Sequence, residues 1–197
     1  MTQAAVKQRY TFSEWLTHND GTDVRYELVD GELIPMGIGK GKHGAIADFL
    51  NDQFKAEISR QSQPWTSKIF SIGMRSPRAG RWDTARIPDL VVLTTEQWES
   101  MIDREAVIEL YEPPPILVVE IVSESTRSQD YKAKRAEYAV LNILEYWVVD
   151  PTQQKITIFK LDEGIYEGEE FANGEVVKSA VFSNFKITAT QMLSAKM

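Results

Sequence analysis

The stretch 116–139, ILVVEIVSESTRSQDYKAKRAEYA, places one carboxylate inside an apolar strand. Glu120 lies in the run 116–122, and a run of this kind is typical of a strand that is buried on both faces. Burying an unpaired carboxylate costs several kcal/mol. The sequence therefore predicts a compensating group for Glu120, which is a nearby Lys or Arg, a proton or a divalent cation.

A second carboxylate, Asp89, stands near the beginning of another apolar strand, predicted over 86–93. Two carboxylates on neighbouring strands repel each other if they converge with nothing between them. Sites built from one or two carboxylates, waters and substrate phosphates are what Mg²⁺ prefers. A magnesium ion at Asp89 and Glu120 would activate water and neutralise charge on a phosphodiester.

The helix predicted over 128–141 adds a cation. Asp130, Lys134 and Tyr138 are spaced by four residues, so they share one face of that helix. We expect Lys134 to lean toward Glu120, where an ammonium group orients the attacking water or stabilises phosphoryl oxygens. The alternative is an intrahelical surface pair of Lys134 with Asp130.

The order of the predicted elements indicates the fold class. A capping box at Thr11 and Glu14 starts a short helix that ends near His18, and Asp30-Gly31 predicts a hairpin over 26–36. A longer helix opens at His43. Further strands are expected over 65–74, 86–93, 116–122, 145–150, 155–160, 165–171 and 175–182, with a short helix near 190–193. This order predicts a single α/β domain over 1–197, with a mixed central sheet flanked by helices and added N- and C-terminal β-hairpins.

Composition limits the class of protein. The 197 residues are 43% hydrophobic and 26% charged, and they contain no Cys, which excludes disulfides and thiolate metal sites. The first residues lack the apolar core of a signal peptide, and no apolar stretch reaches the ~20 residues that span a bilayer. The sequence predicts a cytoplasmic protein without a membrane partner.

Charge is segregated along the chain. The net charge of −7 argues against a general nucleic-acid binder, but the stretch 74–86 holds Arg75, Arg78, Arg81 and Arg86 against one acid. An acidic stretch follows over 96–112. The arginines are either a solvated face or a positive surface beside the site that contacts the DNA backbone.

Several short motifs, taken in order, resemble a known family. They are Pro88-Asp89-Leu90-Val91-Val92, Val119-Glu120-Ile121-Val122-Ser123, Asp130-x-x-x-Lys134-x-x-x-Tyr138 and Glu145-Tyr146-Trp147-Val148-Val149-Asp150-Pro151, preceded by Tyr26-Glu27-Leu28-x-Asp30-Gly31-Glu32 and His43. Across residues 10–195 the chain resembles the Uma-type branch of the restriction-endonuclease-like superfamily, which carries the PD-(D/E)XK nuclease signature.

The resemblance implies a restriction-endonuclease-like fold and a metal-dependent phosphodiesterase. By this analogy Asp89 and Glu120 hold Mg²⁺ or Mn²⁺, with the backbone carbonyl of Ile121 as third ligand. The superfamily usually places its lysine two residues after the acid, where this chain has Val122. Some branches move that lysine to the following helix, and Lys134 fits this relocation.

The resemblance also bears on residues outside the metal site. It implies that His43 positions water or contacts phosphate. Glu27, Glu32, Asp130 and Tyr138 are the candidate accessory residues.

The sequence is compatible with three functions. The first is a Mg²⁺-dependent endonuclease that cuts DNA, working as a homodimer on the duplex. The second is a catalytically silent nuclease-like module that binds nucleic acid or protein, which Val122 and the acidic net charge favour. The third is a purely structural pair of Glu120 with Lys134.

Overall fold

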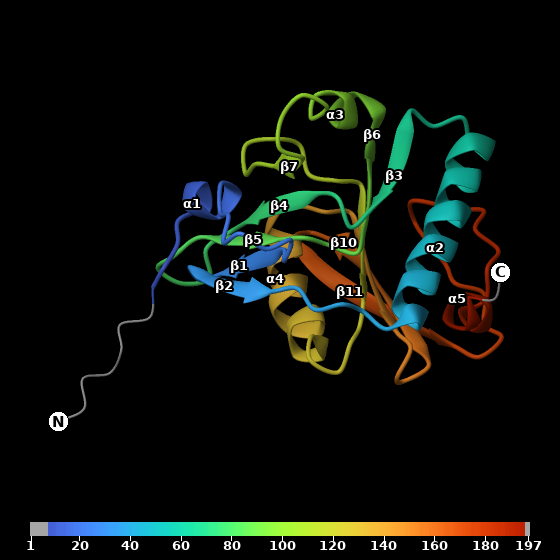
Figure 1. Cartoon of the computed structure of the whole chain (residues 1–197). Helices are drawn as coiled ribbons and strands as arrows, with labels where there is room; N and C mark the ends of the chain where they lie inside the picture. Colours follow the sequence, from blue (N-terminus) through green and yellow to red (C-terminus); the bar gives the residue numbers. More distant parts are fainter. Residues whose placement is uncertain (1–7, 196–197) are drawn as a thin grey trace.

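A six-stranded mixed sheet forms the centre of the fold. The computed structural model describes residues 8–195 (Figure 1). The sheet has the order β11-β10-β9-β8-β6-β3, and only β8 and β9 are a parallel pair within it. Its strands are β3 (Trp65–Ile69), β6 (Leu90–Thr94), β8 (Leu117–Ile121), β9 (Glu145–Asp150), β10 (Lys155–Asp162) and β11 (Ile165–Ala172).

A second, five-stranded sheet has the order β2-β1-β5-β4-β7. Its strands are β1 (Tyr26–Val29), β2 (Glu32–Pro35), β4 (Gly73–Ser76), β5 (Thr84–Arg86) and β7 (Val107–Ile108). The helices are α1 (Phe12–Leu16), α2 (Gly41–Arg60), α3 (Thr95–Glu99), the π-helix η1 (Gln129–Lys134), α4 (Arg135–Val140) and α5 (Ala189–Ser194). The predicted α/β class with mixed sheets flanked by helices is confirmed, and the second sheet is an addition to the single sheet expected.

Strand β8 is buried on both faces, as the apolar run predicts. Figure 1 shows α2 and α5 on one side of the six-stranded sheet and α4 on the other. Val119 and Ile121 pack with α2 residues such as Leu50, whereas Val118 and Val122 pack with Tyr138 of α4. Because side chains alternate along a strand, the Glu120 side chain lies on the α4 side.

Two predicted strands are wrong, and the strand predicted over 86–93 is confirmed only from Leu90, where β6 begins, because Arg86 ends β5 of the other sheet. The segment 65–74 divides into β3 and β4, which belong to different sheets, and Phe70 between them has a positive φ of 52° that breaks the strand. The segment 175–182 forms only an isolated bridge, Val176 with Thr188. The backbone N–H groups of Ala180 and Val181 instead donate to the buried carboxylate of Glu145 at 2.6 and 3.3 Å.

The predicted helix over 128–141 exists, but its first part is the π-helix η1 rather than an α-helix. Of the helices among residues 8–195, none combines the length and apolar character needed to span a bilayer.

Candidate active site

Asp89 and Glu120 come from neighbouring strands. Asp89 directly precedes β6, which pairs antiparallel with β8, the strand that carries Glu120. The Asp89 Oδ2 atom accepts a hydrogen bond of 2.6 Å from the backbone N–H of Ile121, the residue after Glu120. The fold therefore brings the first carboxylate to the end of the strand that bears the second.

His43 contacts the same oxygen of Asp89 that accepts the hydrogen bond from Ile121. It lies in the first turn of α2, and its Nε2 atom is 3.2 Å from Asp89 Oδ2. Its ring stacks on Phe70 at a centroid distance of 5.8 Å. Burial by itself lowers the pKa of His43, but the hydrogen bond and charge of Asp89 and the backbone of Ile121 outweigh it, so the pKa is raised above its usual value. His43 is 21% exposed at its side chain and Asp89 is 12% exposed, so this pair forms the outer edge of the cluster.

Lys134 lies deeper, among three carboxylates. Its Nζ atom is 2.9 Å from Glu120 Oε2, 3.3 Å from Asp130 Oδ1 and 3.4 Å from Glu27 Oε1. Burial alone would lower the pKa of Lys134, but the charges of Glu120, Glu27 and Asp130 raise it. The side chain therefore stays a protonated ammonium group.

Glu120 is engaged through both oxygens. Oε2 contacts Lys134, and Oε1 accepts a hydrogen bond of 2.7 Å from the Tyr138 hydroxyl. Burial raises the pKa of Glu120 well above its usual value. Lys134 opposes the rise, while the charges of Asp89, Asp130 and Glu27 add to it. A positive charge near Glu120 in addition to Lys134 would stabilise the ionised form.

The π-helix η1 sets where Asp130 and Lys134 point. Its six residues precede the α-helical turns of α4. The Tyr146 hydroxyl donates a hydrogen bond of 2.9 Å to the backbone carbonyl of Asp130. Burial raises the pKa of Asp130, and Lys134 opposes that rise. Short π-helical segments are frequent at functional sites, because they shift side chains relative to a regular helix.

Arg86 occupies the interior and not the surface. It is 1% exposed, and it donates to Glu137 from Nε at 2.8 Å and from Nη2 at 2.6 Å. Its Nη1 atom donates to Glu27 Oε2 at 3.2 Å. The expected contact of Arg86 with DNA is therefore corrected, because its guanidinium is enclosed by two carboxylates.

Glu137 was missed by the sequence analysis. It is 7% exposed and lies three residues after Lys134 on the continuous η1–α4 helix. That spacing places Glu137 on the same side as Lys134 and is the signal that could have identified it.

The remaining arginines and Glu32 lie outside this cluster of contacts. Glu32 pairs with Arg9 at 3.1 Å. Arg75 and Arg78 contact Asp83 at 3.5 and 2.7 Å, and Arg81 lies over the Trp82 ring at 5.6 Å. The loop of Arg78 and Arg81 precedes β5, whereas Asp89 follows it, so the two lie at opposite ends of a three-residue strand.

The donor set fits a hard cation. Within residues 8–195 no three His, Asp or Glu side chains are arranged to hold an ion together. A magnesium ion needs only one or two carboxylates, since waters and substrate fill its other positions. Five buried carboxylates, Glu27, Asp89, Glu120, Asp130 and Glu137, face the two permanent cations Lys134 and Arg86 and the partly exposed His43. This excess of negative charge, together with the raised pKa of Glu120, favours an added cation.

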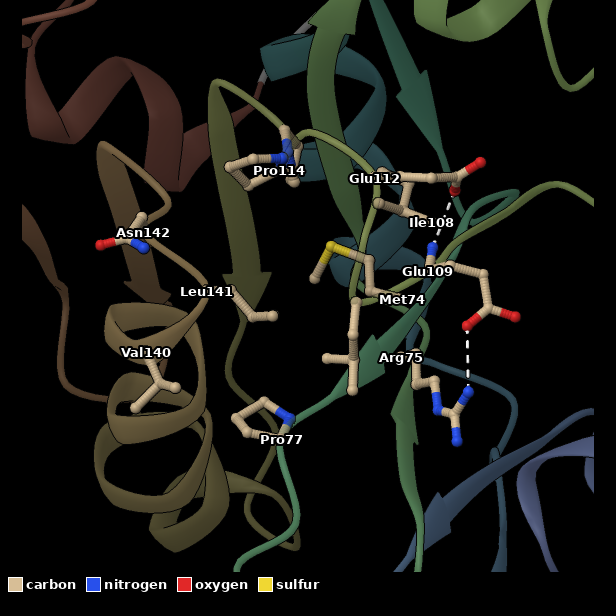
Figure 2. A pocket seen from close by; sticks show the side chains of 12 residues that line it. Met74, Arg75, Pro77, Ile108, Glu109, Glu112, Pro114, Val140, Leu141 and Asn142 are labelled. Carbon is tan, nitrogen blue, oxygen red and sulfur yellow. Dashed lines mark hydrogen bonds and ion pairs between the residues drawn. The ribbon is translucent and has the colours of Figure 1, made fainter.

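A separate cavity of about 340 Å³ lies away from these carboxylates (Figure 2). It lies between β4, the 108–115 segment and the end of α4, where Met74, Pro77 and Leu141 line it. Arg75 and Glu109 form an ion pair of 3.2 Å at its edge. Arg75 alone among the expected site residues lines this cavity.

Comparisons with known proteins bear on the family and the fold. A search of curated proteins finds no match. The crystal structure of a "putative nuclease belonging to DUF820" from Anabaena variabilis superimposes with a TM-score of 0.73 at 17% sequence identity, covering 94% of this chain and 98% of that chain. At this identity the match shows the fold alone. The model of the Uma2 family, described as "Putative restriction endonuclease", matches residues 10–190. The chain therefore belongs to the Uma2 family of restriction-endonuclease-like proteins.

Proposed function

We propose that this protein is a Mg²⁺-dependent endonuclease that hydrolyses phosphodiester bonds of DNA. The observation that carries the proposal is the contact of Asp89, which directly precedes β6, with the backbone of the strand that bears Glu120, together with the pair of Glu120 with the buried ammonium group of Lys134. Membership of a restriction-endonuclease-like family supports the same reaction class.

Asp89, Glu120 and the carbonyl of Ile121 are the residues that would hold Mg²⁺ or Mn²⁺. When bound, such an ion polarises a phosphoryl oxygen and lowers the pKa of a bound water. Asp89 is kept in place by His43 and by the Ile121 N–H, and Glu120 by Tyr138. The protein thus holds the carboxylates in a fixed orientation.

Lys134 supplies a fixed positive charge. Because three carboxylates keep it protonated, Lys134 does not accept a proton from water. Its role is to stabilise negative charge on the phosphoryl oxygens and to orient the attacking water. Asp130 and Glu27 fix the ammonium group for that role.

His43 and the arginine loop are the candidate contacts to DNA. His43 lies at the exposed edge of the cluster, where it can reach a phosphate or a water. Arg78 and Arg81 are exposed, and Arg75 lies beside them, so these three side chains are the candidate contacts to the DNA backbone. One copy carries one carboxylate pair, and two copies related by a two-fold axis would place one pair at each strand of a duplex, which is the reason to expect a homodimer.

The test is cleavage of supercoiled plasmid and linear DNA over a range of Mg²⁺ and Mn²⁺ concentrations. The matched variants are Asp89→Asn and Glu120→Gln, which change charge but little volume. We expect nicked and linear products with the unmodified protein and a loss of at least a hundredfold in rate with either variant. Equal cleavage by all three proteins, or none by any, contradicts the proposal.

A second candidate function is a nuclease-like module that binds without cutting. The side chains of Lys134 and Glu120 pair with each other and are only 5% and 4% exposed. This burial favours a module that binds without cutting. DNA binding that persists without any affinity for Mg²⁺ or Mn²⁺ up to millimolar concentration distinguishes this function from the first.

A further inference from the structure

We infer that Arg86 is a positioning residue that holds Lys134 in place through Glu27 and Glu137. The consequence for catalysis rests on the proposed function, but the positioning itself is a statement about contacts and is testable without any cleavage. The inference starts from the depth of Arg86, which is 1% exposed and comes from β5 of the smaller sheet.

Arg86 joins two elements that are far apart in the sequence. Its forked donors reach both oxygens of Glu137 on α4, at 2.8 and 2.6 Å, and the third nitrogen reaches Glu27 on β1 at 3.2 Å. The planar guanidinium makes such two-point contacts in a fixed geometry, which a lysine ammonium cannot reproduce. The smaller sheet is thereby attached to the helix that carries Lys134.

Glu27 contacts both Arg86 and Lys134, so it links Arg86 to the candidate site. Its Oε2 atom accepts a hydrogen bond from Arg86. Its Oε1 atom accepts a hydrogen bond of 3.2 Å from the Ile87 N–H and lies 3.4 Å from Lys134 Nζ. Ile87 is two residues before Asp89 in the turn between β5 and β6. One carboxylate therefore fixes the lysine and the backbone that leads to the candidate ligand.

Glu137 constrains Lys134 from the other side. The two residues are three positions apart on one helix, so an anchor at Glu137 fixes the rotation of the helical turn that presents Lys134. Without Arg86, Glu137 would lose the donor to both of its oxygens, and Glu27 would keep only Lys134 and the Ile87 N–H as partners. They would then move toward solvent or toward Lys134, and the ammonium group would lose its present position.

The test uses acylation of lysine amines by acetic anhydride, with modification of each lysine followed by peptide mass spectrometry. The variants are Arg86→Gln and Arg86→Lys, and the control is Glu145→Gln. Glu145 is also a fully buried carboxylate, but its partners are Trp147 and the 179–181 segment. The exposed Lys42 serves as the internal reference for reagent activity.

We expect Lys134 to be protected in the unmodified protein and in Glu145→Gln. In Arg86→Gln its labelling rate should rise at least about tenfold, and in Arg86→Lys it should rise as well, because charge alone does not restore the fork. If Arg86→Gln does not fold, Arg86→Lys and Glu137→Gln provide the same comparison. Continued protection of Lys134 in the folded Arg86 variants, or equal exposure in Glu145→Gln, overturns the inference.

Cleavage provides the second readout. Arg86→Gln should slow DNA cleavage in the otherwise unmodified protein. It should cause no further loss of cleavage rate in Lys134→Met, because both changes remove the same function, that of the Lys134 ammonium group. Equal additional losses in the two backgrounds indicate a general effect on the fold and contradict the inference. If the unmodified protein cuts no DNA, the proposed function fails, while the labelling experiment still decides the role of Arg86.

Discussion

The ammonium nitrogen of Lys134 lies 2.9 Å from Glu120 Oε2, and this contact joins the π-helix η1 to the central strand β8. The same nitrogen contacts Asp130 and Glu27. Lys134 is therefore the one cation that these three buried carboxylates share among the residues described, 8–195. Its removal leaves uncompensated negative charge in the interior.

Lys134→Met should lower the free energy of unfolding by about 3–5 kcal/mol, the range for breaking a buried ion pair by removing one partner. Urea denaturation at neutral pH measures this loss. Lys132→Met is the matched control, since Lys132 is exposed two residues earlier, and it should change stability by less than about 0.5 kcal/mol. Equal stability of the two variants contradicts the described role of Lys134.

Val122→Lys tests the usual lysine position of the superfamily. Val122 is 2% exposed and packs in the apolar cluster with Tyr138, so a lysine there would bury an ammonium group among apolar side chains. We expect a loss of at least about 3 kcal/mol of stability and no gain in cleavage. A stable and more active variant contradicts the assignment of the ammonium function to Lys134.

Tyr138→Phe removes the hydroxyl that donates to Glu120 at 2.7 Å. The loss should cost about 1–3 kcal/mol of stability because one oxygen of a buried carboxylate loses its donor. Tyr166→Phe is the matched control, because the Tyr166 hydroxyl donates at 2.7 Å to the carbonyl of Ile143 instead. Thermal unfolding with and without Mg²⁺ should show altered metal stabilisation only for Tyr138→Phe. The same change in both variants argues against a role of Tyr138 at the metal site.

Asp83, which lies away from the candidate site, gives a prediction for the pH dependence of stability. Burial raises its pKa, but the Phe12 N–H, at 2.9 Å, and Arg78 and Arg75 outweigh burial and lower it below its usual value. A lowered folded-state pKa stabilises the protein above the unfolded pKa, about 3.9, and this stabilisation is lost as pH falls through the folded value. Asp83→Asn should therefore be about 1–2 kcal/mol less stable at pH 7.

The difference between Asp83→Asn and the unmodified protein should shrink as the pH falls below about 3.9. Chemical denaturation at several pH values measures it. A difference that is constant with pH contradicts the ion pairs of Asp83 with Arg75 and Arg78.

The fold class and the central strands could be predicted because their patterns are local. The apolar run around Glu120 and the Asp30-Gly31 turn each specify their own element, and the structure has both where they were expected. The break at Phe70 could not be predicted, because the residues around it suit a strand and a positive φ decides their assignment to two sheets. The irregular 175–182 segment depends on Glu145, a long-range contact with no local signal.

The candidate site was likewise predictable only where the signal is local. The shared face of Lys134 and Tyr138 followed from helical spacing, although η1 is a π-helix. Arg86 was expected at the surface because it belongs to an arginine-rich stretch, and its burial depends on Glu27 and Glu137, which meet it only in the folded chain. Charge runs identify arginines, but tertiary partners decide which of them are buried.

The central claim is that Asp89 and Glu120 bind one divalent cation. Calorimetric titration of Mg²⁺ and of Mn²⁺ into the unmodified protein and into Asp89→Asn/Glu120→Gln measures it without any substrate. We predict one site per chain in the unmodified protein and no binding in the double variant. Absence of binding by the unmodified protein up to millimolar metal, or the same affinity in both proteins, would contradict the account.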